Sequence, residues 1–114
     1  MNKQMTTTAE LLRAMGNEQR LMILHWLADP CAWFPAQRDG DLVEDGVCVG
    51  FITEKLGLSQ PTVTGHLQLL AKAGLVTSKR IKNWVFYKLV PQRLAEASAA
   101  ISALTHTATE NITR

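Results

Sequence analysis

The chain has 114 residues, of which 46% are hydrophobic and 19% charged, a balance typical of one small globular domain rather than of a disordered chain. No apolar run approaches the about 20 residues of a membrane span, and the polar segment 1–8 lacks the apolar stretch of a signal peptide. We therefore expect a cytoplasmic protein without a membrane partner. The chain has two cysteines, which are too few for a disulfide framework.

The net charge of +2 hides an uneven distribution of charge along the chain. Residues 29–46 contain five acids and one base, whereas residues 72–93 contain six bases and no acid. The basic segment suits a polyanion such as the DNA backbone, although a solvated surface is the ordinary alternative.

Two helices are predicted ahead of the acidic segment. Thr8 can cap a helix over residues 8–15 that ends at Gly16, and Asn17 can cap a second helix that reaches about Ala28. The second helix is apolar nearly all round, so we expect it to be buried between its neighbours.

The acidic segment is predicted to be a long loop. Residues 29–47 contain Pro30, Pro35, Gly40 and Gly46 among the acids and have no helical or strand period. Loops of this length are unusual in compact domains and are often functional. Residues 47–49 could add a short strand at its end. We call residues 29–47 the insertion.

A helix-turn-helix is predicted directly after the insertion. Residues 50–56 fit a short helix, and the turn Gly57-Leu58 follows it. Ser59 then opens a longer helix that runs to Ala73 and stops at Gly74. At 100° per residue the longer helix sends Val63, Leu67 and Leu70 into the core.

The opposite face of this helix is polar and nearly uncharged over its first two turns. Small hydroxyls and amides can enter a major groove and read base edges, whereas an ordinary surface helix carries Glu and Lys pairs. We therefore predict that this helix binds double-stranded DNA, with Ser59 and His66 near phosphates. The DNA-contacting residues expected on it are Ser59, Gln60, Thr62, Thr64, Gly65, His66, Gln68 and Lys72.

A β-hairpin and a last helix are predicted after the recognition helix. Residues 75–81 and 84–89 are β-type runs around the two-residue turn Lys82-Asn83, in which Asn83 tolerates positive φ. The bases near the tip suit phosphates or the minor groove. The hairpin residues expected at DNA are Lys79, Arg80, Lys82 and Asn83. Pro91 suits the first turn of the last helix.

Three segments resemble the ArsR/SmtB family of transcriptional repressors. Residues 15–24 (MGNEQRLMIL) are similar to the opening of that family, and residues 59–67 (SQPTVTGHL) with 70–76 (LAKAGLV) to its recognition helix and exit. Residues 80–89 are similar to its wing. The resemblance covers residues 8–90 and implies a mainly α, winged helix-turn-helix fold in one domain, residues 1–114.

The resemblance also implies a homodimer that is built from the first and last helices, binds an inverted repeat and releases it when an effector binds. The sequence agrees, because a small monomer has little core left to cover the apolar stripe of the last helix. The expected interface residues are Leu11, Leu12, Met15, Leu94, Ile101 and Leu104.

The metal-sensing motif of the family is incomplete in this chain. Cys48 falls on the first position of the family's Cys-x-Cys, but Gly50 falls on the second. Three interpretations of Cys31 and Cys48 remain open: inert small hydrophobic residues, a thiol switch, or half of a metal site. We expect no metal and no cofactor, and the effector is not identified by the sequence.

Other function classes are less well supported by the sequence. No serine or cysteine has the context of an activated nucleophile, and there is no phosphate loop, so we do not expect an enzyme. A winged helix that binds proteins, or a constitutive architectural DNA binder without effector sensing, are the alternatives to a regulated repressor.

Overall fold

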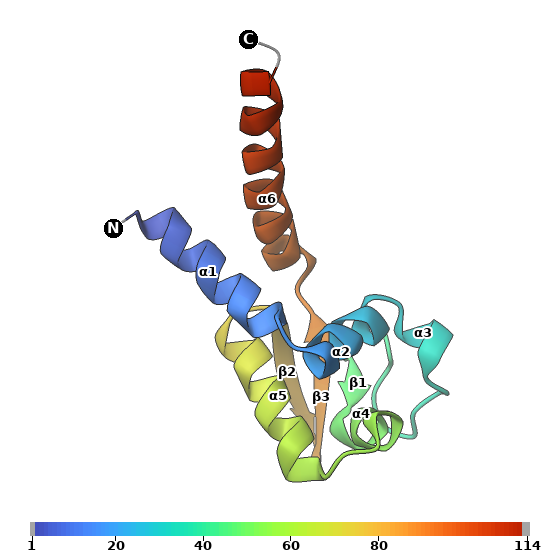
Figure 1. The fold of residues 1–114 in the computed structure, drawn as a ribbon. Coiled ribbons are helices and arrows are strands. Elements are labelled where there is room, and N and C mark those ends of the chain that lie inside the picture. The colour runs from blue at the N-terminus through green and yellow to red at the C-terminus, as the bar shows by residue number, and fades with distance from the viewer. Residues whose placement is uncertain (1, 113–114) are drawn as a thin grey trace.

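The computed structural model describes residues 2–112, which form six helices and one three-stranded sheet (Figure 1). In chain order the elements are α1 Lys3–Met15, α2 Glu18–Ala28, α3 Pro30–Trp33, β1 Val47–Cys48, α4 Val49–Leu56, α5 Gln60–Lys72, β2 Val76–Ile81, β3 Trp84–Leu89 and α6 Pro91–Ile112. The mainly α fold with a small hairpin, expected from the sequence, is confirmed.

Helix α1 is longer than predicted. It begins at Lys3 rather than near Thr8, because the Asn2 side chain accepts hydrogen bonds from the backbone N–H groups of Gln4 (2.8 Å) and Met5 (3.4 Å). The prediction that Thr8 caps this helix was therefore wrong. The predicted end at Gly16 is confirmed, and α1 points away from the body of the molecule (Figure 1).

Helix α2 begins where the sequence predicted but is not buried all round. The Asn17 side chain caps it by accepting from the Arg20 backbone N–H at 3.1 Å. Ile23, Leu24 and Leu27 lie in the core, whereas Leu21 and Met22 remain exposed. The expectation of burial on every side was wrong, since Leu21, Met22 and His25 on one face of α2 remain exposed.

The insertion folds back over the body rather than forming a free loop. It contains the short helix α3, which the sequence did not predict, and buries Phe34 against Phe51 of α4, with ring centroids 6.2 Å apart. Near its end Gly46 has φ +103°, and a side chain there would collide with the Tyr87 backbone. The insertion is thus packed directly on β3.

The sheet has the order β1-β3-β2, and every neighbouring pair is antiparallel. Val47 and Cys48 of β1 pair with Tyr87 and Phe86 of β3, which confirms the short strand at the end of the insertion. The two-residue turn between β2 and β3 is also confirmed, but the positive φ (55°) falls on Lys82 and not on Asn83. We call the β2–β3 hairpin the wing.

Helix α6 projects beyond the body and lacks cover from the rest of the chain. Only Ala97 of its 22 residues is buried. The Cα radius of gyration is 16.4 Å, compared with about 13 Å for a compact chain of this length. Figure 1 shows α1 and α6 diverging on the same side of the body.

Candidate nucleic-acid interface

Helices α4 and α5 form the helix-turn-helix predicted from the sequence. Gly57, in the left-handed conformation (φ 70°), ends α4 and donates its N–H to the Thr53 carbonyl at 3.0 Å. Ser59 then caps α5 by accepting from the Thr62 N–H at 3.4 Å. Because Val63, Leu67 and Leu70 are completely buried, the rotation of α5 about its own axis is fixed by the core.

This rotation turns the predicted DNA-reading face of α5 outward. Ser59, Gln60, Thr62, Gln68 and Lys72 are exposed, and Thr64, Gly65 and His66 are half-buried. A Cβ added at Gly65 would meet nothing within 4 Å outside the neighbouring backbone of α5, so the helix surface is open at that point. The structure thus leaves all eight predicted residues, the Ser59 cap included, at least partly accessible.

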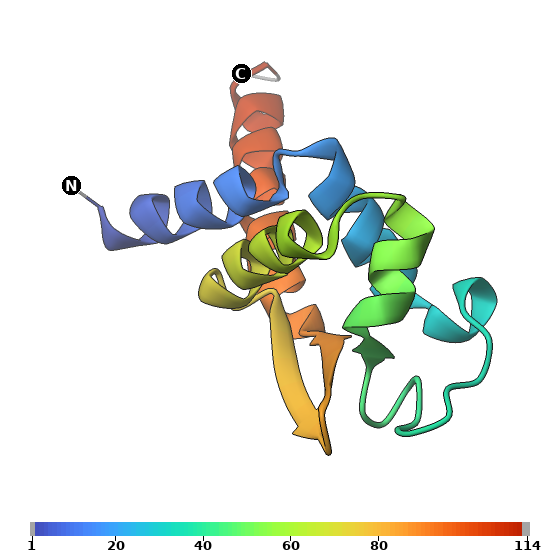
Figure 2. The same cartoon turned by 90° about the horizontal axis from the view of Figure 1, so that it is seen from below.

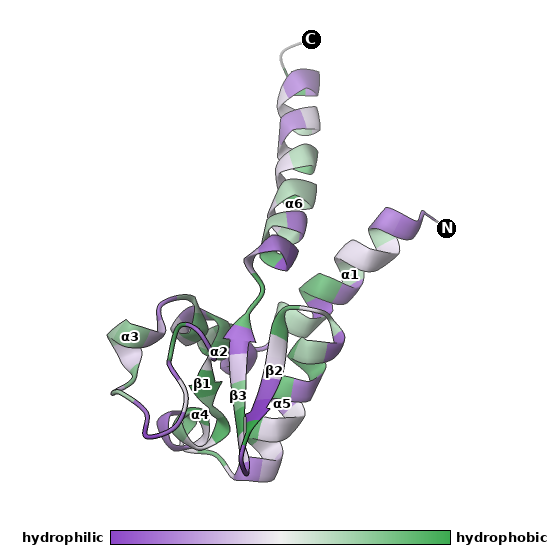
Figure 3. Ribbon diagram, turned by 180° about the vertical axis from the view of Figure 1, so that it is seen from behind, coloured by the Kyte–Doolittle hydropathy of each residue, from purple (hydrophilic) through white to green (hydrophobic). Residues whose placement is uncertain are grey.

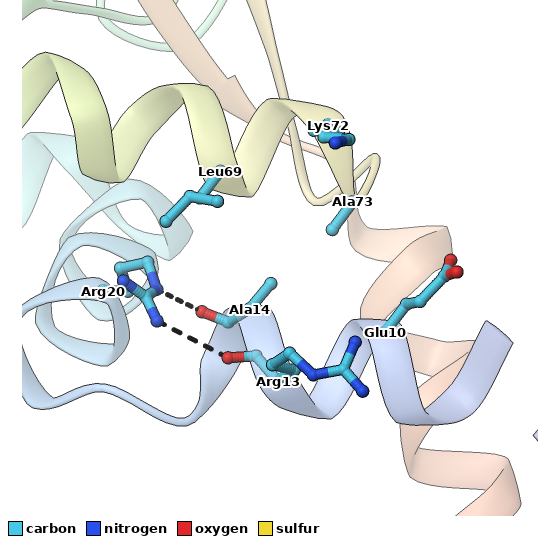
Figure 4. A pocket seen from close by; sticks show the side chains of 7 residues that line it. All are labelled: Glu10, Arg13, Ala14, Arg20, Leu69, Lys72 and Ala73. Carbon is cyan, nitrogen blue, oxygen red and sulfur yellow. Dashed lines mark hydrogen bonds between the residues drawn. The ribbon is translucent and has the colours of Figure 1, made fainter. Parts of the chain in front are cut away.

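Arg20 of α2 bonds to the end of α1, beside α5 (Figure 4). Its guanidinium donates to the Ala14 carbonyl at 2.6 Å and to the Arg13 carbonyl at 3.5 Å, which satisfies the last turn of α1. Another of its nitrogens lies 3.1 Å from His66 Nδ1. Since arginine can only donate, Nδ1 accepts and the neutral ring carries its proton on Nε2. A contact of His66 with a phosphate stays a prediction and would use Nε2.

The Arg20–His66 contact predicts a pH dependence of stability. Burial and the neighbouring Arg20 charge both lower the pKa of His66 below 6.5. The folded chain therefore binds this proton less tightly than the unfolded chain does. We expect the free energy of unfolding, from urea titrations between about pH 5 and 7.5, to fall as the pH drops through 6.5. His66→Asn keeps a hydrogen-bond acceptor for Arg20 that does not titrate, so this variant should lose the pH dependence. A pH profile of stability that is unchanged in this variant would contradict the assignment of the pH dependence to His66.

The wing projects beside α5, as the sequence predicted (Figure 2). Phe86 is buried in the body, whereas Trp84 is 50% exposed close to the wing tip. Arg80 and Asn83 are exposed and lie on the wing where a phosphate backbone could reach them.

Two of the predicted phosphate-binding lysines are paired with the insertion instead. Lys79 Nζ lies 2.5 Å from Asp45 Oδ1, and Lys82 Nζ lies 3.0 Å from Asp39 Oδ1. The Lys79 hydrogen bond lowers the pKa of Asp45, so that carboxylate stays ionised under ordinary conditions. Lys88 also donates to the insertion, at the Glu44 carbonyl (3.4 Å).

The carboxylates of the insertion therefore pair with two of the six bases in residues 72–93, Lys79 and Lys82. Arg93 pairs with Glu96 at 2.6 Å and donates to the Ala73 carbonyl at the end of α5. Within residues 2–112, only Lys72 and Arg80 of the six bases lack such a partner. Sequence reasoning missed this arrangement, although the opposite charges of the two segments were the available signal.

The two cysteines are free thiols in this structure. Cys31 is exposed on α3, and Cys48 is half-buried in β1. No group of three or more His, Cys, Asp or Glu side chains within residues 2–112 is placed to hold a metal ion. The choice among inert residues, a thiol switch and half of a metal site completed by another subunit stays open.

The predicted dimer residues differ in how much surface they offer. Leu11 is buried in the core of the single chain, and Met15 and Leu94 are half-buried against it. Leu12, Ile101 and Leu104 are 41%, 49% and 67% exposed. The accessible apolar surface on these two helices also includes Met5, which the sequence analysis did not select.

A helix-turn-helix that is followed directly by a β-hairpin wing defines a winged helix-turn-helix protein. Residues 42–78, which include the whole α4–α5 unit, match the model of the bacterial regulatory proteins of the arsR family. The HTH-type transcriptional regulator YbzH of Bacillus subtilis is 40% identical over 79 residues, which are 69% of this chain and 79% of that protein. The chain belongs to the ArsR family and is a DNA-binding transcriptional regulator.

Other similar proteins agree with this assignment. The biofilm growth-associated repressor of Agrobacterium fabrum is 29% identical over 112 residues, which are 98% of this chain and 83% of that protein. The structure of HlyU from Vibrio cholerae superposes with a TM-score of 0.60 and 31% identity, and covers 94% of this chain and 97% of its own. These proteins are regulators rather than enzymes, and a protein-binding module is not favoured. No helix within residues 2–112 has the length and apolarity needed to cross a membrane.

Proposed function

We propose that this chain is a homodimeric repressor that binds an inverted DNA repeat and leaves it when an effector binds. The observation that carries the proposal is the open, polar and nearly uncharged outer face of α5 beside the wing. Such a face can donate hydrogen bonds to base edges and accept hydrogen bonds from them. The start of α5 and the wing can contact phosphates on either side.

Exposed apolar side chains on the projecting helices support the homodimer. Met5 and Leu12 on α1, and Ile101 and Leu104 on α6, are 58%, 41%, 49% and 67% exposed. Figure 3 shows hydrophobic positions along both projecting helices. A monomer would leave them in water, whereas a two-fold partner that presents the same surface would bury them.

A two-fold dimer constrains the DNA that is bound. Two copies of α5 would enter successive major grooves about 34 Å apart, so the site should be an inverted repeat. Occupation of such a site blocks access of other proteins to the promoter, and one of the similar proteins above is named a repressor.

The test combines operator selection with sedimentation of the purified full chain. Sequencing of the DNA fragments that the protein retains should yield an inverted repeat, and a reporter under that site should be repressed. Leu104→Glu should raise the dimer dissociation constant about tenfold or more, because it places charge in an apolar contact. Ser102→Glu, at an exposed position about 160° round α6 from Leu104 at 100° per residue, is the matched control and should leave the dimer intact.

Two outcomes would count against the proposal. A clean monomer at micromolar concentration that still binds the repeat tightly would contradict the homodimer. Retention of DNA with no shared sequence, combined with unaltered reporter expression, would favour an architectural binder over a repressor.

A further inference from the structure

A pocket of about 260 Å³ lies between the insertion, α4 and the wing. Its walls include the rings of Phe51, Trp84 and Phe86, together with the Cys48 side chain. Arg38 of the insertion stands at the pocket as well. We call this the aromatic pocket. It is separate from the α5 face that reads DNA.

The wall that the insertion provides is held in place by its own hydrogen bonds. Gln37 accepts from the Cys48 backbone N–H at 2.6 Å and donates to the Gly46 carbonyl at 2.9 Å. Gly40 has φ +81°, and a Cβ at this residue would lie only 2.8 Å from the Phe86 ring. The backbone therefore rests directly on the aromatic wall, and the pocket exists before any ligand arrives.

The pocket has one charge that is not neutralised. Asp39 is paired with Lys82, whereas Arg38 is exposed and makes no ion pair within residues 2–112. An aromatic interior beside a single free guanidinium favours a ligand with a flat apolar body and one anionic group.

We propose that the aromatic pocket binds a small aromatic carboxylate, with its ring against Phe51 and Trp84 over the buried Phe86, and its carboxylate on Arg38. The volume lies just below the about 300–1,000 Å³ of drug-sized ligand sites, which limits the ligand to one ring or two fused rings. The proposal deepens the function proposed above and rests on it, since it identifies a site for the effector.

The position of the pocket connects a bound ligand to the wing. Arg38 adjoins Asp39, which holds Lys82, and Trp84 is separated from Lys82 only by Asn83. A ligand that bridges Arg38 and Trp84 keeps the insertion on the wing and adds a negative charge near the phosphate-binding surface. DNA affinity therefore falls when the ligand binds, and by linkage DNA lowers the affinity for the ligand by the same factor.

Binding is tested first without DNA, with 2-naphthoate as the probe. The full chain has three tryptophans, so a ¹⁵N spectrum resolves Trp84 from Trp26 and Trp33 as internal references. The Trp84 indole N–H resonance should move most and should saturate. Arg38→Gln should weaken binding about fivefold, as expected for a solvent-exposed ion pair. Arg13→Gln, an exposed arginine on α1, is the matched control and should leave binding unchanged.

Further probes and variants distinguish this proposal from nonspecific hydrophobic binding to the surface. To the native chain, the neutral analogue 2-naphthalenemethanol should bind about fivefold more weakly than 2-naphthoate does. To the Arg38→Gln variant, the two probes should bind with equal affinity. Cys48→Met places extra atoms in the pocket and should reduce binding of both probes. Equal affinity for the two probes in the native chain, or no saturable change at Trp84, would overturn the proposal.

The link to DNA is measured separately, so that the two proposals can fail independently. Saturating 2-naphthoate should weaken operator binding by the native chain about tenfold, and less so for Arg38→Gln. Unchanged operator affinity at saturation would overturn the role as an effector site. A chain that binds 2-naphthoate at Trp84 but selects no DNA would instead contradict the proposed repressor function.

Discussion

Replacement of Gly65 by leucine is expected to lower operator affinity about a hundredfold while the fold remains at least as stable as that of the native chain. Gly65 lies inside α5 on the face predicted to enter the major groove. A Cβ added there meets nothing within 4 Å outside the neighbouring backbone of α5, so the free protein leaves open space where the new side chain starts. In the complex it would occupy the space that the base pairs need.

The stability change has the opposite sign to the affinity change. Glycine within a helix costs about 1 kcal/mol relative to alanine, so Gly65→Ala should raise the free energy of unfolding. Urea titration and operator titration of the same preparations measure the two effects. Few substitutions distinguish the binding surface from the core so directly.

Gly50→Ala is the matched control for this experiment. Gly50 is also a helical glycine, but it lies in α4 rather than α5. A methyl group has room there, since its nearest neighbour would be Cys48 Sγ at 3.7 Å. It should gain similar stability and keep native DNA affinity. A folded Gly65→Leu variant with native operator affinity would show that α5 is not the reading helix.

Local sequence patterns predicted the helix-turn-helix well. The helical spacing of Val63, Leu67 and Leu70 predicted which face of α5 is buried. Gly57 marked the end of α4 and Ser59 the start of α5, both by ordinary capping chemistry. The same patterns located the hairpin turn at Lys82-Asn83.

The predictions failed where the outcome depends on a single cap or on distant contacts. The run of three threonines at residues 6–8 shows no helical pattern, so the first residues of α1, before Thr8, were not predicted. The Asn2 side chain caps this start of the helix. The ion pairs Asp39–Lys82 and Asp45–Lys79 join residues that are 43 and 34 positions apart, and no local period reports such a pairing. Only the complementary charges of the insertion and the wing pointed to it.

The double substitution Asp39→Asn with Asp45→Asn is expected to raise DNA affinity about tenfold at low salt. Both carboxylates now hold wing lysines that a phosphate backbone would otherwise contact. Removal of the two negative charges releases Lys79 and Lys82 and also reduces repulsion of the DNA. The Asp39 and Asp45 side chains are 25% and 15% exposed. Asparagine has nearly the same shape and keeps an oxygen that can accept the Asp41 N–H now bonded to Asp45, so the fold should tolerate the change.

The salt dependence provides the sharper measurement. Each lysine that gains a phosphate displaces about one more counterion, so the slope of log affinity against log salt should steepen by about two for each subunit. The control Asp29→Asn with Glu18→Gln removes the same number of charges away from the wing and should change the slope little. Because the pKa of Asp45 is lowered, the native pairing persists at neutral pH, and the comparison does not depend on small differences in pH. An unchanged slope in the Asp39→Asn, Asp45→Asn variant would mean that the two lysines do not reach the DNA, and would leave Arg80 as the contact that the wing makes.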